Sequence, residues 1–214
     1  MNNLIIFEGI CCSGKTTTCE LLSKKITELG YTSIYNHGAM TYTETGKKFK
    51  KIIEIKDMPI SVSYFLTDLI INTQNVIKPY LSDPNTIVIQ DRYYDAITTY
   101  INAYGQYSNN DYNIYDIQDT LVQNGIFVKP LLKVFCIPPF EVIIERMEKS
   151  KTSPVHDYYR KHPKFFKMVY DELEKKAKES PDTIIIDTSS DVSVQNSIEK
   201  ILEYLKKLRN WRYK

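Results

Sequence analysis

Five short apolar runs are spaced along the chain, and each is bounded by polar or turn-forming residues. Runs of about four to eight residues that are rich in β-branched and aromatic side chains are typical of buried strands. The sequence therefore predicts strands at 2–9, 31–37, 86–91, 131–137 and 183–187.

Longer segments between these runs carry apolar residues at helical spacing. Cys19, Leu22 and Ile26 recur three or four positions apart, and Gly30 follows as a stop signal. We expect helices at 15–29, 45–56, 60–81, 94–104, 116–124, 138–150, 158–179 and 191–209, with a polar loop at 105–118 and a break at 151–157.

The alternation of strands with helices favours an α/β fold, in which a five-stranded parallel sheet has helices on both faces. We expect a single domain over 1–214, because no linker or repeat divides the chain. Ligands of such sheets bind beyond the carboxyl ends of the strands. The segments that follow the first and third strands should therefore face one crevice.

Composition narrows the function classes. Hydrophobic residues make up 43% and charged residues 25% of the chain, and the net charge of +2 does not indicate a nucleic-acid polymer as partner. The apolar runs are too short to span a bilayer and the N-terminus lacks the features of a signal peptide, so we expect no membrane partner and a cytoplasmic location. The four cysteines form no C-x-x-C pair, which disfavours a zinc site and indicates reduced thiols.

The segment after the first strand matches the phosphate-loop pattern G-x-x-x-x-G-K-[ST]. Its glycines let the backbone curl so that N–H groups point at phosphate oxygens, and the following helix adds its positive end. We expect the loop to bind ATP, with Lys15 on the outer phosphates and the Thr16 hydroxyl on Mg²⁺. The expected ATP-binding residues are Gly9, Cys11, Cys12, Ser13, Gly14, Lys15, Thr16 and Thr17.

Two adjacent cysteines are unusual in such a loop. Loop positions between the two motif glycines bind phosphate through the backbone, so Cys11 and Cys12 are compatible with nucleotide binding. A thiol at a helix N-terminus can have a lowered pKa and be oxidisable, which leaves a redox switch open. The alternative is that both are small, tolerated side chains.

Asp91 and Arg92 end the third strand beside the expected crevice. Arg92 can hold a second phosphate through the two-pronged grip of a guanidinium. Asp91 is a candidate to organise water around Mg²⁺ or to orient the acceptor. The alternative for both residues is a structural ion pair.

Two segments carry recognisable motifs, "FEGICCSGKTT" (7–17) and "DRYYDAITTY" (91–100). They resemble FEGIDGSGKTT and D-R-Y-x-x-S-x-x-A-Y, which are motifs of the thymidylate kinase family. Further similar segments are "ETGKKFKKII" (44–53), "SYFLTDL" (63–69), "KPLLKVFCIPPFEVIIERMEK" (129–149) and "DYYRKHPKFFKMVYDEL" (157–173).

The resemblance implies a P-loop NTPase fold with a lid at about 149–160, a homodimer, and ATP-dependent phosphoryl transfer to a nucleoside monophosphate, most simply dTMP to dTDP. It implies that Phe65 stacks on the substrate base and that Tyr100 lies beneath the sugar. Packing is the alternative for both side chains. The expected substrate-binding residues are Glu8, Phe65, Arg92, Tyr93 and Tyr100; the expected metal-site residues are Thr16 and Asp91.

Several positions depart from the family pattern. Cys11 replaces an acid that contacts the sugar, Leu69 replaces an arginine that addresses the base, and Ala96 replaces the serine of the D-R-Y motif. The phosphate-binding arginine after the second strand is absent, with only His37 and Lys47 nearby. Some members carry a catalytic arginine at the position of Cys12, so here that charge should come from the lid region; among Arg146, Lys149, Lys151 and Arg160 we favour the two arginines, against the alternative of a solvated charged face.

The expected catalytic set is therefore Lys15, Asp91, Arg92, Arg146 and Arg160. Two other functions remain open. A deoxynucleoside kinase would use a carboxylate base, for which Glu8 is a candidate. A P-loop protein that has lost catalysis would bind ATP without transferring phosphate. A regulatory GTPase is disfavoured, because the chain has no [NT]-K-x-D element.

Overall fold

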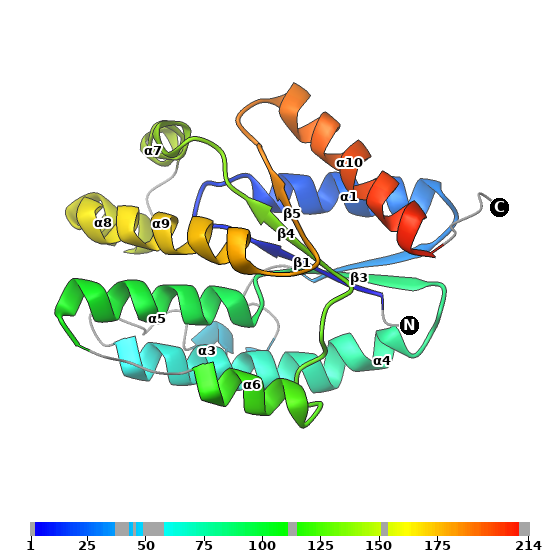
Figure 1. Ribbon diagram of the computed structural model, residues 1–214, viewed down its shortest axis with the longest axis horizontal. Helices are drawn as coiled ribbons and strands as arrows, with labels where there is room; N and C mark the ends of the chain where they lie inside the picture. Colours follow the sequence, from blue (N-terminus) through cyan, green and yellow to red (C-terminus); the bar gives the residue numbers. More distant parts are fainter. Residues whose placement is uncertain are drawn as a thin grey trace.

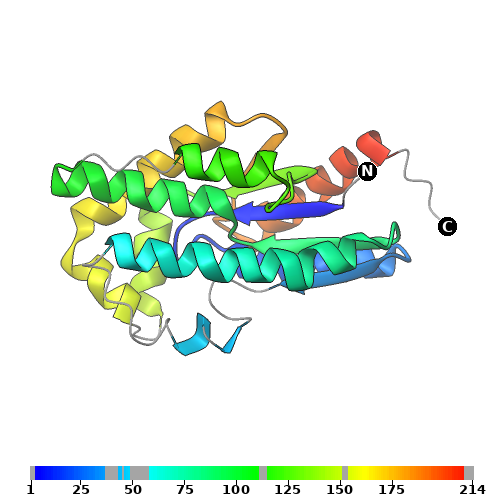
Figure 2. The ribbon, with the colours of Figure 1, turned by 90° about the horizontal axis from the view of Figure 1, so that it is seen from below.

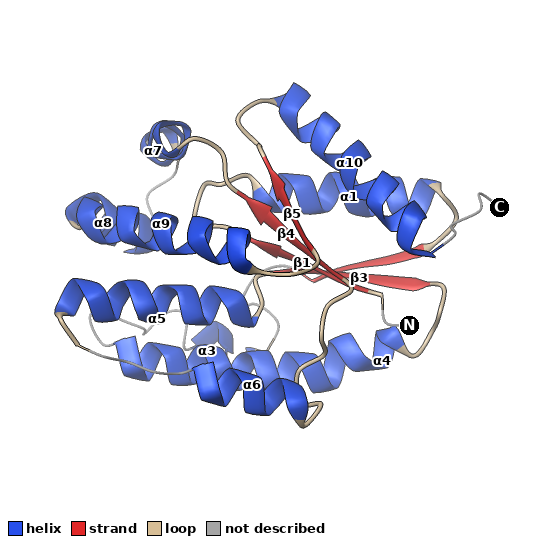
Figure 3. Cartoon of the chain, viewed as in Figure 1, coloured by secondary structure: helices blue, strands red, loops and turns tan. Residues whose placement is uncertain are grey.

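A parallel sheet of five strands runs through the molecule (Figure 1, Figure 3). The computed structural model describes residues 3–36, 43–44, 46–48, 58–110, 115–150 and 154–209. The order is β2-β3-β1-β4-β5, and each neighbouring pair is parallel, which confirms the predicted fold class. The strands are β1 (Leu4–Glu8), β2 (Thr32–Asn36), β3 (Thr86–Asp91), β4 (Leu132–Cys136) and β5 (Thr183–Ile186).

One face of the sheet is covered by α1 (Lys15–Glu28) and α10 (Asp191–Arg209), which lie together on the same side in Figure 1. Alternate strand residues point to this face, as the period of a strand requires. Ile5 and Phe7 of β1 pack there with Leu22 of α1 and Ile201 of α10, all fully buried.

The opposite face is covered by α3 (Met58–Asn72), α5 (Tyr94–Ser108) and α9 (Pro163–Glu179). α5 packs against both α3 and α9, and Figure 2 shows α3 and α5 side by side. Leu4 and Ile6, the other alternate set of β1, are buried here. The two central strands β1 and β3 are thus buried along their whole length, which explains why their sequences are nearly continuous hydrophobic runs.

Lys133 is a charged exception within β4. Its side chain points to the α5 face, where its Nζ lies 2.5 Å from Asp95 Oδ2. Lys176 of α9 lies 3.4 Å from the other carboxylate oxygen of Asp95, a residue with no exposed surface. The ion pairs therefore compensate a buried charge at the start of α5.

The helix expected at 60–81 is three helical segments. After α3 the chain forms one wide π-helical turn, η1 (Thr73–Ile77), followed by α4 (Lys78–Leu81). The Lys78 N–H bonds to the Thr73 carbonyl, five residues back. Pro79 lacks an N–H and cannot continue the regular helical ladder, and the wide turn accompanies it.

The loop expected at 105–118 is shorter in the structure, because the helices on both sides extend into it. α5 continues through Gly105 and ends at Ser108, with Asn109 as a left-handed cap at φ 54°. α6 (Tyr115–Gln123) begins within the expected loop. Gly105 is buried, so packing outweighs its low helix propensity.

The charged helix expected at 158–179 is interrupted. α8 (Pro154–Lys161) and α9 are separate helices, and α7 (Phe140–Lys149) precedes them. Pro163 occupies the first turn of α9 and cannot donate the hydrogen bond that a continuous helix would need. The expected lid region is thus represented by the end of α7 and by α8.

Most of the helix expected at 45–56 lies outside the described residues, as do His37 and Lys151. Over the part of the chain that the structure describes, none of the helices combines the length and the apolar character needed to cross a membrane.

Candidate active site

The loop between β1 and α1 curls back on itself at the carboxyl edge of the sheet. Gly9 has φ 157° and Gly14 has φ 81°. A Cβ on Gly9 would collide with Ser13 Oγ, and one on Gly14 would lie 3.1 Å from Thr188 Cβ. Both motif glycines are therefore required by the close approach of neighbouring chain as well as by their backbone angles.

Lys15 lies within the curl of this loop. Its Nζ donates to the Ile10 carbonyl at 2.8 Å and contacts Ser13 Oγ at 3.4 Å. Only 6% of the residue is exposed, and burial together with the charge of Arg92 lowers its pKa. A buried ammonium held this close to the loop is placed to meet an anion bound there.

A cavity of about 380 Å³ opens beside the loop. Its walls are the loop residues from Cys12 to Thr17, Arg146 of α7 and the start of α10. The Arg146 guanidinium donates to the carbonyls of Thr188 (2.5 Å) and Ser189 (3.1 Å), and its Nη1 lies 3.5 Å from the Cys12 carbonyl. Arg146 thus joins the loop to the turn after β5, as a cation on the cavity wall.

Thr16 and Asp91, the two residues expected to form a metal site, lie next to each other in the structure. Thr16 Oγ1 donates to Asp91 Oδ2 at 3.2 Å, and the Tyr35 hydroxyl lies 3.4 Å from the same oxygen. A hydroxyl and a carboxylate are hard oxygen ligands of the kind Mg²⁺ prefers. Among the described residues, no group of three or more His, Cys, Asp or Glu side chains is placed to hold a metal ion.

Arg92 stands at the end of β3 in a left-handed conformation, with φ 67°. Its N–H bonds to the Phe7 carbonyl at 2.8 Å, which fixes the turn against the central strand. A non-glycine residue at such angles costs about 1 kcal/mol or more and persists only where its surroundings impose it.

Gln90 supplies that constraint, and sequence reasoning missed it. Its fully buried amide Nε2 donates to the carbonyls of Asp91 (3.1 Å) and Arg92 (2.9 Å). Its Oε1 accepts from Asn36 at 2.6 Å and from Asn72 at 3.2 Å. Three buried amides from β2, α3 and β3 therefore brace the turn that presents Arg92; a glutamine within an otherwise apolar strand was the available signal.

The Arg92 guanidinium faces the loop and α5. Its Nη2 lies 3.7 Å from Cys11 Sγ, and its carbon lies 5.7 Å from the centre of the Tyr100 ring. Tyr159 of α8 is 2% exposed and is hydrogen-bonded to Tyr100. Tyr159 was not predicted for the site, because nothing in the sequence indicates that α8 folds over α5.

Glu8 lies beneath this cluster as a cap for α5. Its Oε1 accepts from the backbone N–H groups of Tyr93 (2.9 Å) and Ala96 (3.3 Å). Burial, reinforced by the charge of Asp95, raises the pKa of Glu8 to about 8. The geometry therefore gives Glu8 a role in positioning the Arg92 segment.

Several predicted residues lie away from the loop. The Tyr93 ring is 1% exposed and packs against Phe127, while its hydroxyl bonds to Thr73 and to the Val128 N–H. This places the Tyr93 side chain in the core, so its expected contact with substrate is not supported. Phe65 is half-buried on α3, and Leu69 is buried in the same cluster as Tyr93.

Of the expected lid cations, Arg146 contacts the phosphate loop. Arg160 and Lys149 contact residues outside this loop. Arg160 donates to the Met147 carbonyl at 2.6 Å and to Asp157 at 3.0 Å, so its guanidinium is engaged at the end of α7. Lys149 pairs with Glu145 on exposed surface. Lys47, which is a described cation near the position of the missing arginine after the second strand, pairs with Glu44 on exposed surface as well.

The α8 residue that does reach the loop is His156. Its Nε2 lies 3.9 Å from Cys12 Sγ, and its Nδ1 lies 2.9 Å from Ser150 Oγ. From the sequence, the segment "KTSPVHD" predicts only a break between helices, because a single histidine carries little signal by itself.

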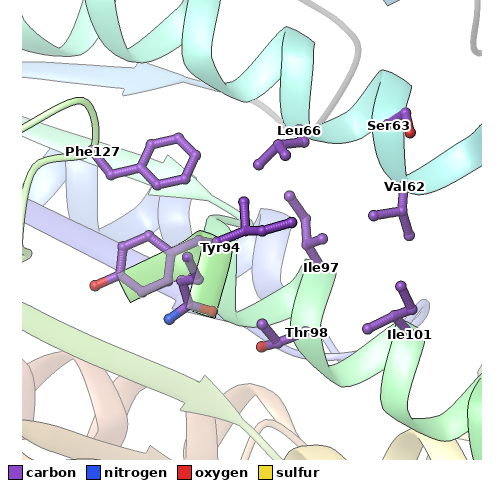
Figure 4. A pocket seen from close by; sticks show the side chains of 10 residues that line it. Val62, Ser63, Leu66, Tyr94, Ile97, Thr98, Ile101 and Phe127 are labelled. Carbon is purple, nitrogen blue, oxygen red and sulfur yellow. The ribbon is translucent and has the colours of Figure 1, made fainter. Parts of the chain in front are cut away.

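A second hollow, of about 230 Å³, lies between α3, α5 and α6 (Figure 4). Figure 4 shows Val62 and Leu66 of α3 pointing toward Ile97 and Ile101 of α5. Its lining carries no charged side chain, so it offers nothing to a phosphate.

Comparisons with known proteins agree with one another. The family model described as thymidylate kinase matches residues 7–198. The thymidylate kinase of Sulfurihydrogenibium sp. (strain YO3AOP1) is 34% identical over 157 residues, which are 71% of this chain and 73% of that protein. The thymidylate kinase of Campylobacter lari (strain RM2100 / D67 / ATCC BAA-1060) is 25% identical over 205 residues, 94% of this chain and 98% of that protein.

A solved structure is also similar. The crystal structure of thymidylate kinase from Ehrlichia chaffeensis superposes with a TM-score of 0.64 and 22% identity, covering 96% of this chain and 98% of that chain. At this identity the likeness establishes the fold.

Proposed function

The chain belongs to the thymidylate kinase family, and from that premise we propose that it transfers the γ-phosphoryl group of ATP to dTMP, giving ADP and dTDP. The observation that carries the proposal is the convergence of two anion-binding features on adjacent strands. β1 leads into the phosphate loop, β3 leads into Arg92, and Thr16 and Asp91 meet between them at 3.2 Å. Phosphoryl transfer requires that two phosphates be held in line while their charge is neutralised.

The loop is the donor side of this site. Its backbone N–H groups and the N-terminus of α1 would hold the β- and γ-phosphates, with Lys15 on the outer oxygens. Arg146 would supply a further cation from the wall of the adjoining cavity. Mg²⁺ would be held through Thr16 with Asp91, and when bound it neutralises charge on the donor phosphates.

Arg92 is the acceptor side. Its guanidinium would grip the monophosphate, and the buried amides around Gln90 keep it aimed at the loop. Tyr100, beneath the same guanidinium, would pack against the sugar, and Phe65 would stack on the base. Cys11 stands where the family has an acid and Leu69 where it has an arginine, so the sugar and base contacts must differ from the family pattern.

A substrate panel tests this proposal. Purified protein with ATP and Mg²⁺ is offered dTMP, dUMP, dCMP, UMP and CMP, and thymidine as the unphosphorylated control. We expect ADP and dTDP in equal amounts with dTMP and no product with thymidine. ATP binding without transfer to any monophosphate would contradict the proposal and support a P-loop protein that has lost catalysis.

The deoxynucleoside kinase alternative is disfavoured by the geometry around Glu8. A general base must be ionised and within reach of the hydroxyl. The raised pKa of about 8 keeps Glu8 largely protonated at neutral pH, and its Oε1 is engaged by two backbone N–H groups.

We further propose a homodimer that works in the cytoplasm, where ATP and dTMP are available. Two large apolar side chains support an apolar helical interface: Ile60 of α3 is 49% exposed and Ile117 of α6 is 48% exposed. Sedimentation of the purified protein at several concentrations tests the assembly.

A further inference from the structure

The four cysteines differ in how accessible they are. Cys19 is fully buried and Cys136 is 1% exposed, both within the core on the α1 face of the sheet. Cys11 and Cys12 are half-buried in the phosphate loop. Reagents that enter the crevice can therefore reach the two loop thiols and not the two core thiols.

Cys11 is surrounded by positive charge. Arg92 Nη2, at the end of β3, lies 3.7 Å from its sulfur. Lys15 at the start of α1 and His156 of α8 act on it as well, and the hydroxyls that face the cluster are those of Tyr100 on α5 and Tyr159 on α8. Burial raises the pKa of both tyrosines, so neither adds a competing negative charge near neutral pH.

The two neighbouring thiols respond to this setting in opposite ways. Burial opposes ionisation of Cys11, but the neighbouring charges of Arg92 and Lys15, together with the nearby His156, outweigh burial and lower the pKa of Cys11 to about 7. Burial and the charge of Cys11 raise the pKa of Cys12. The thiolate, which is the nucleophilic form, is therefore concentrated on Cys11 near neutral pH.

The backbone conformation at Cys12 helps to fix the positions of the two loop thiols. Cys12 has φ 63°, in the left-handed region where a side chain costs about 1 kcal/mol and glycine costs nothing. Its sulfur lies 3.9 Å from His156 Nε2, so α8 contacts the loop at the Cys12 thiol. The tight turn at Cys12 also holds the preceding sulfur on the Arg92 side of the loop.

We propose that Cys11 is a modification site for small-molecule disulfides, and that a mixed disulfide on Cys11 reversibly inactivates the kinase. The Cys11 thiolate attacks one sulfur of the disulfide R–S–S–R; a new S–S bond forms, the old one breaks, and R–S⁻ leaves with the electron pair. The disulfide is the oxidant, and a reducing thiol reverses the exchange. The effect on activity rests on the proposed function, whereas the chemistry at Cys11 does not.

Inactivation follows from where the adduct would sit. The Cys11 sulfur lies between the phosphate loop and the Arg92 guanidinium, which are the donor and acceptor sides of the proposed reaction. A group attached there would displace the acceptor phosphate from Arg92 and remove the thiolate charge that faces it. Conversely, bound nucleotides would cover Cys11 and slow its modification.

The test uses the full chain and the neutral probe bis(2-hydroxyethyl) disulfide. Mass spectrometry of the intact protein counts adducts, peptide mapping locates them, and both are followed over a range of pH. We expect one adduct per chain on Cys11, with a rate midpoint near pH 7. ATP with dTMP should slow the reaction at least about tenfold, and dithiothreitol should restore activity.

Cys11→Ser and Cys12→Ser are the matched variants, each compared with its own untreated activity. Cys11→Ser should lose both the adduct and the inactivation, while Cys12→Ser should keep both. First modification of Cys12, Cys19 or Cys136, or a rate midpoint near the ordinary thiol pKa of about 8.5, would overturn the reactive site. A Cys11 adduct with activity undiminished would overturn the inhibition. Because adducts are scored by mass, a protein unable to phosphorylate dTMP would still report on Cys11.

Discussion

Thr16 Oγ1 lies 3.2 Å from Asp91 Oδ2, although 75 residues separate them in the chain. The contact exists because β1 and β3 are parallel neighbours, with Phe7 beside Asp91. The loop that follows β1 and the end of β3 therefore lie at the same edge of the sheet. In the proposed reaction, this hydroxyl and this carboxylate would provide oxygen ligands for the divalent cation between the two phosphates.

Removing the Thr16 hydroxyl should therefore weaken metal use. We expect Thr16→Ala to raise the Mg²⁺ concentration needed for half-maximal activity by about 10–100-fold, measured by Mg²⁺ titration of the initial rate. Thr27→Ala is the matched control, because the Thr27 hydroxyl makes an exposed hydrogen bond to the Ser23 carbonyl within its own helix. Equal Mg²⁺ requirements in the two variants would show that Thr16 does not hold the ion.

The left-handed backbone at Cys12 makes a stability prediction. Cys12→Gly and Cys12→Ala both remove the thiol, but only glycine accepts φ 63° without strain. The glycine variant should have a free energy of unfolding about 1 kcal/mol higher than the alanine variant, as measured by urea denaturation. The opposite order would mean that the loop relaxes from this conformation when the side chain changes.

The buried ion pairs of Asp95 should contribute far more to the free energy of unfolding than a surface ion pair does. Asp95→Asn leaves Lys133 and Lys176 without their buried partner, and we expect a loss of about 3 kcal/mol in the free energy of unfolding. Asp171→Asn, which breaks an exposed pair with Lys167, should cost less than about 1 kcal/mol. Similar losses in both variants would argue that solvent reaches Asp95.

Glu8 should make stability depend on pH. Its pKa in the folded protein, about 8, lies above the ordinary value of 4.5, so between these values the folded state binds more protons than the unfolded state. The free energy of unfolding from this group therefore falls as the pH rises from about 4.5 to about 8.

Glu8→Gln removes this titration and keeps an oxygen for the Tyr93 and Ala96 N–H groups. Denaturation of both proteins across this pH range should show the variant gaining stability relative to the parent as the pH rises. Parallel pH profiles would contradict burial of an ionisable Glu8.

Much of the fold could be predicted because its signals are local. β1 is apolar and buried along almost its whole length, and the loop glycines, Lys15 and Thr16 follow it in the sequence. Asp91 and Arg92 likewise follow the third strand, and parallel pairing then brings the two segments together.

The parts that could not be predicted depend on contacts between distant elements. Gln90 braces Arg92 together with amides from β2 and α3, and Tyr159 and His156 reach the site from α8. The resemblance implies that Tyr93 contacts the substrate, yet the start of α5 turns its ring into the core. No periodicity in the sequence reports such long-range packing.

The central claim is that Arg92 receives the acceptor phosphate while the loop holds the donor. Steady-state kinetics of Arg92→Gln with dTMP as the varied substrate tests it most directly, with the Kd for ATP measured on the same protein. The account predicts a fall of at least about 100-fold in kcat/KM for dTMP with the Kd for ATP within about twofold of the parent. An unchanged kcat/KM for dTMP would contradict it.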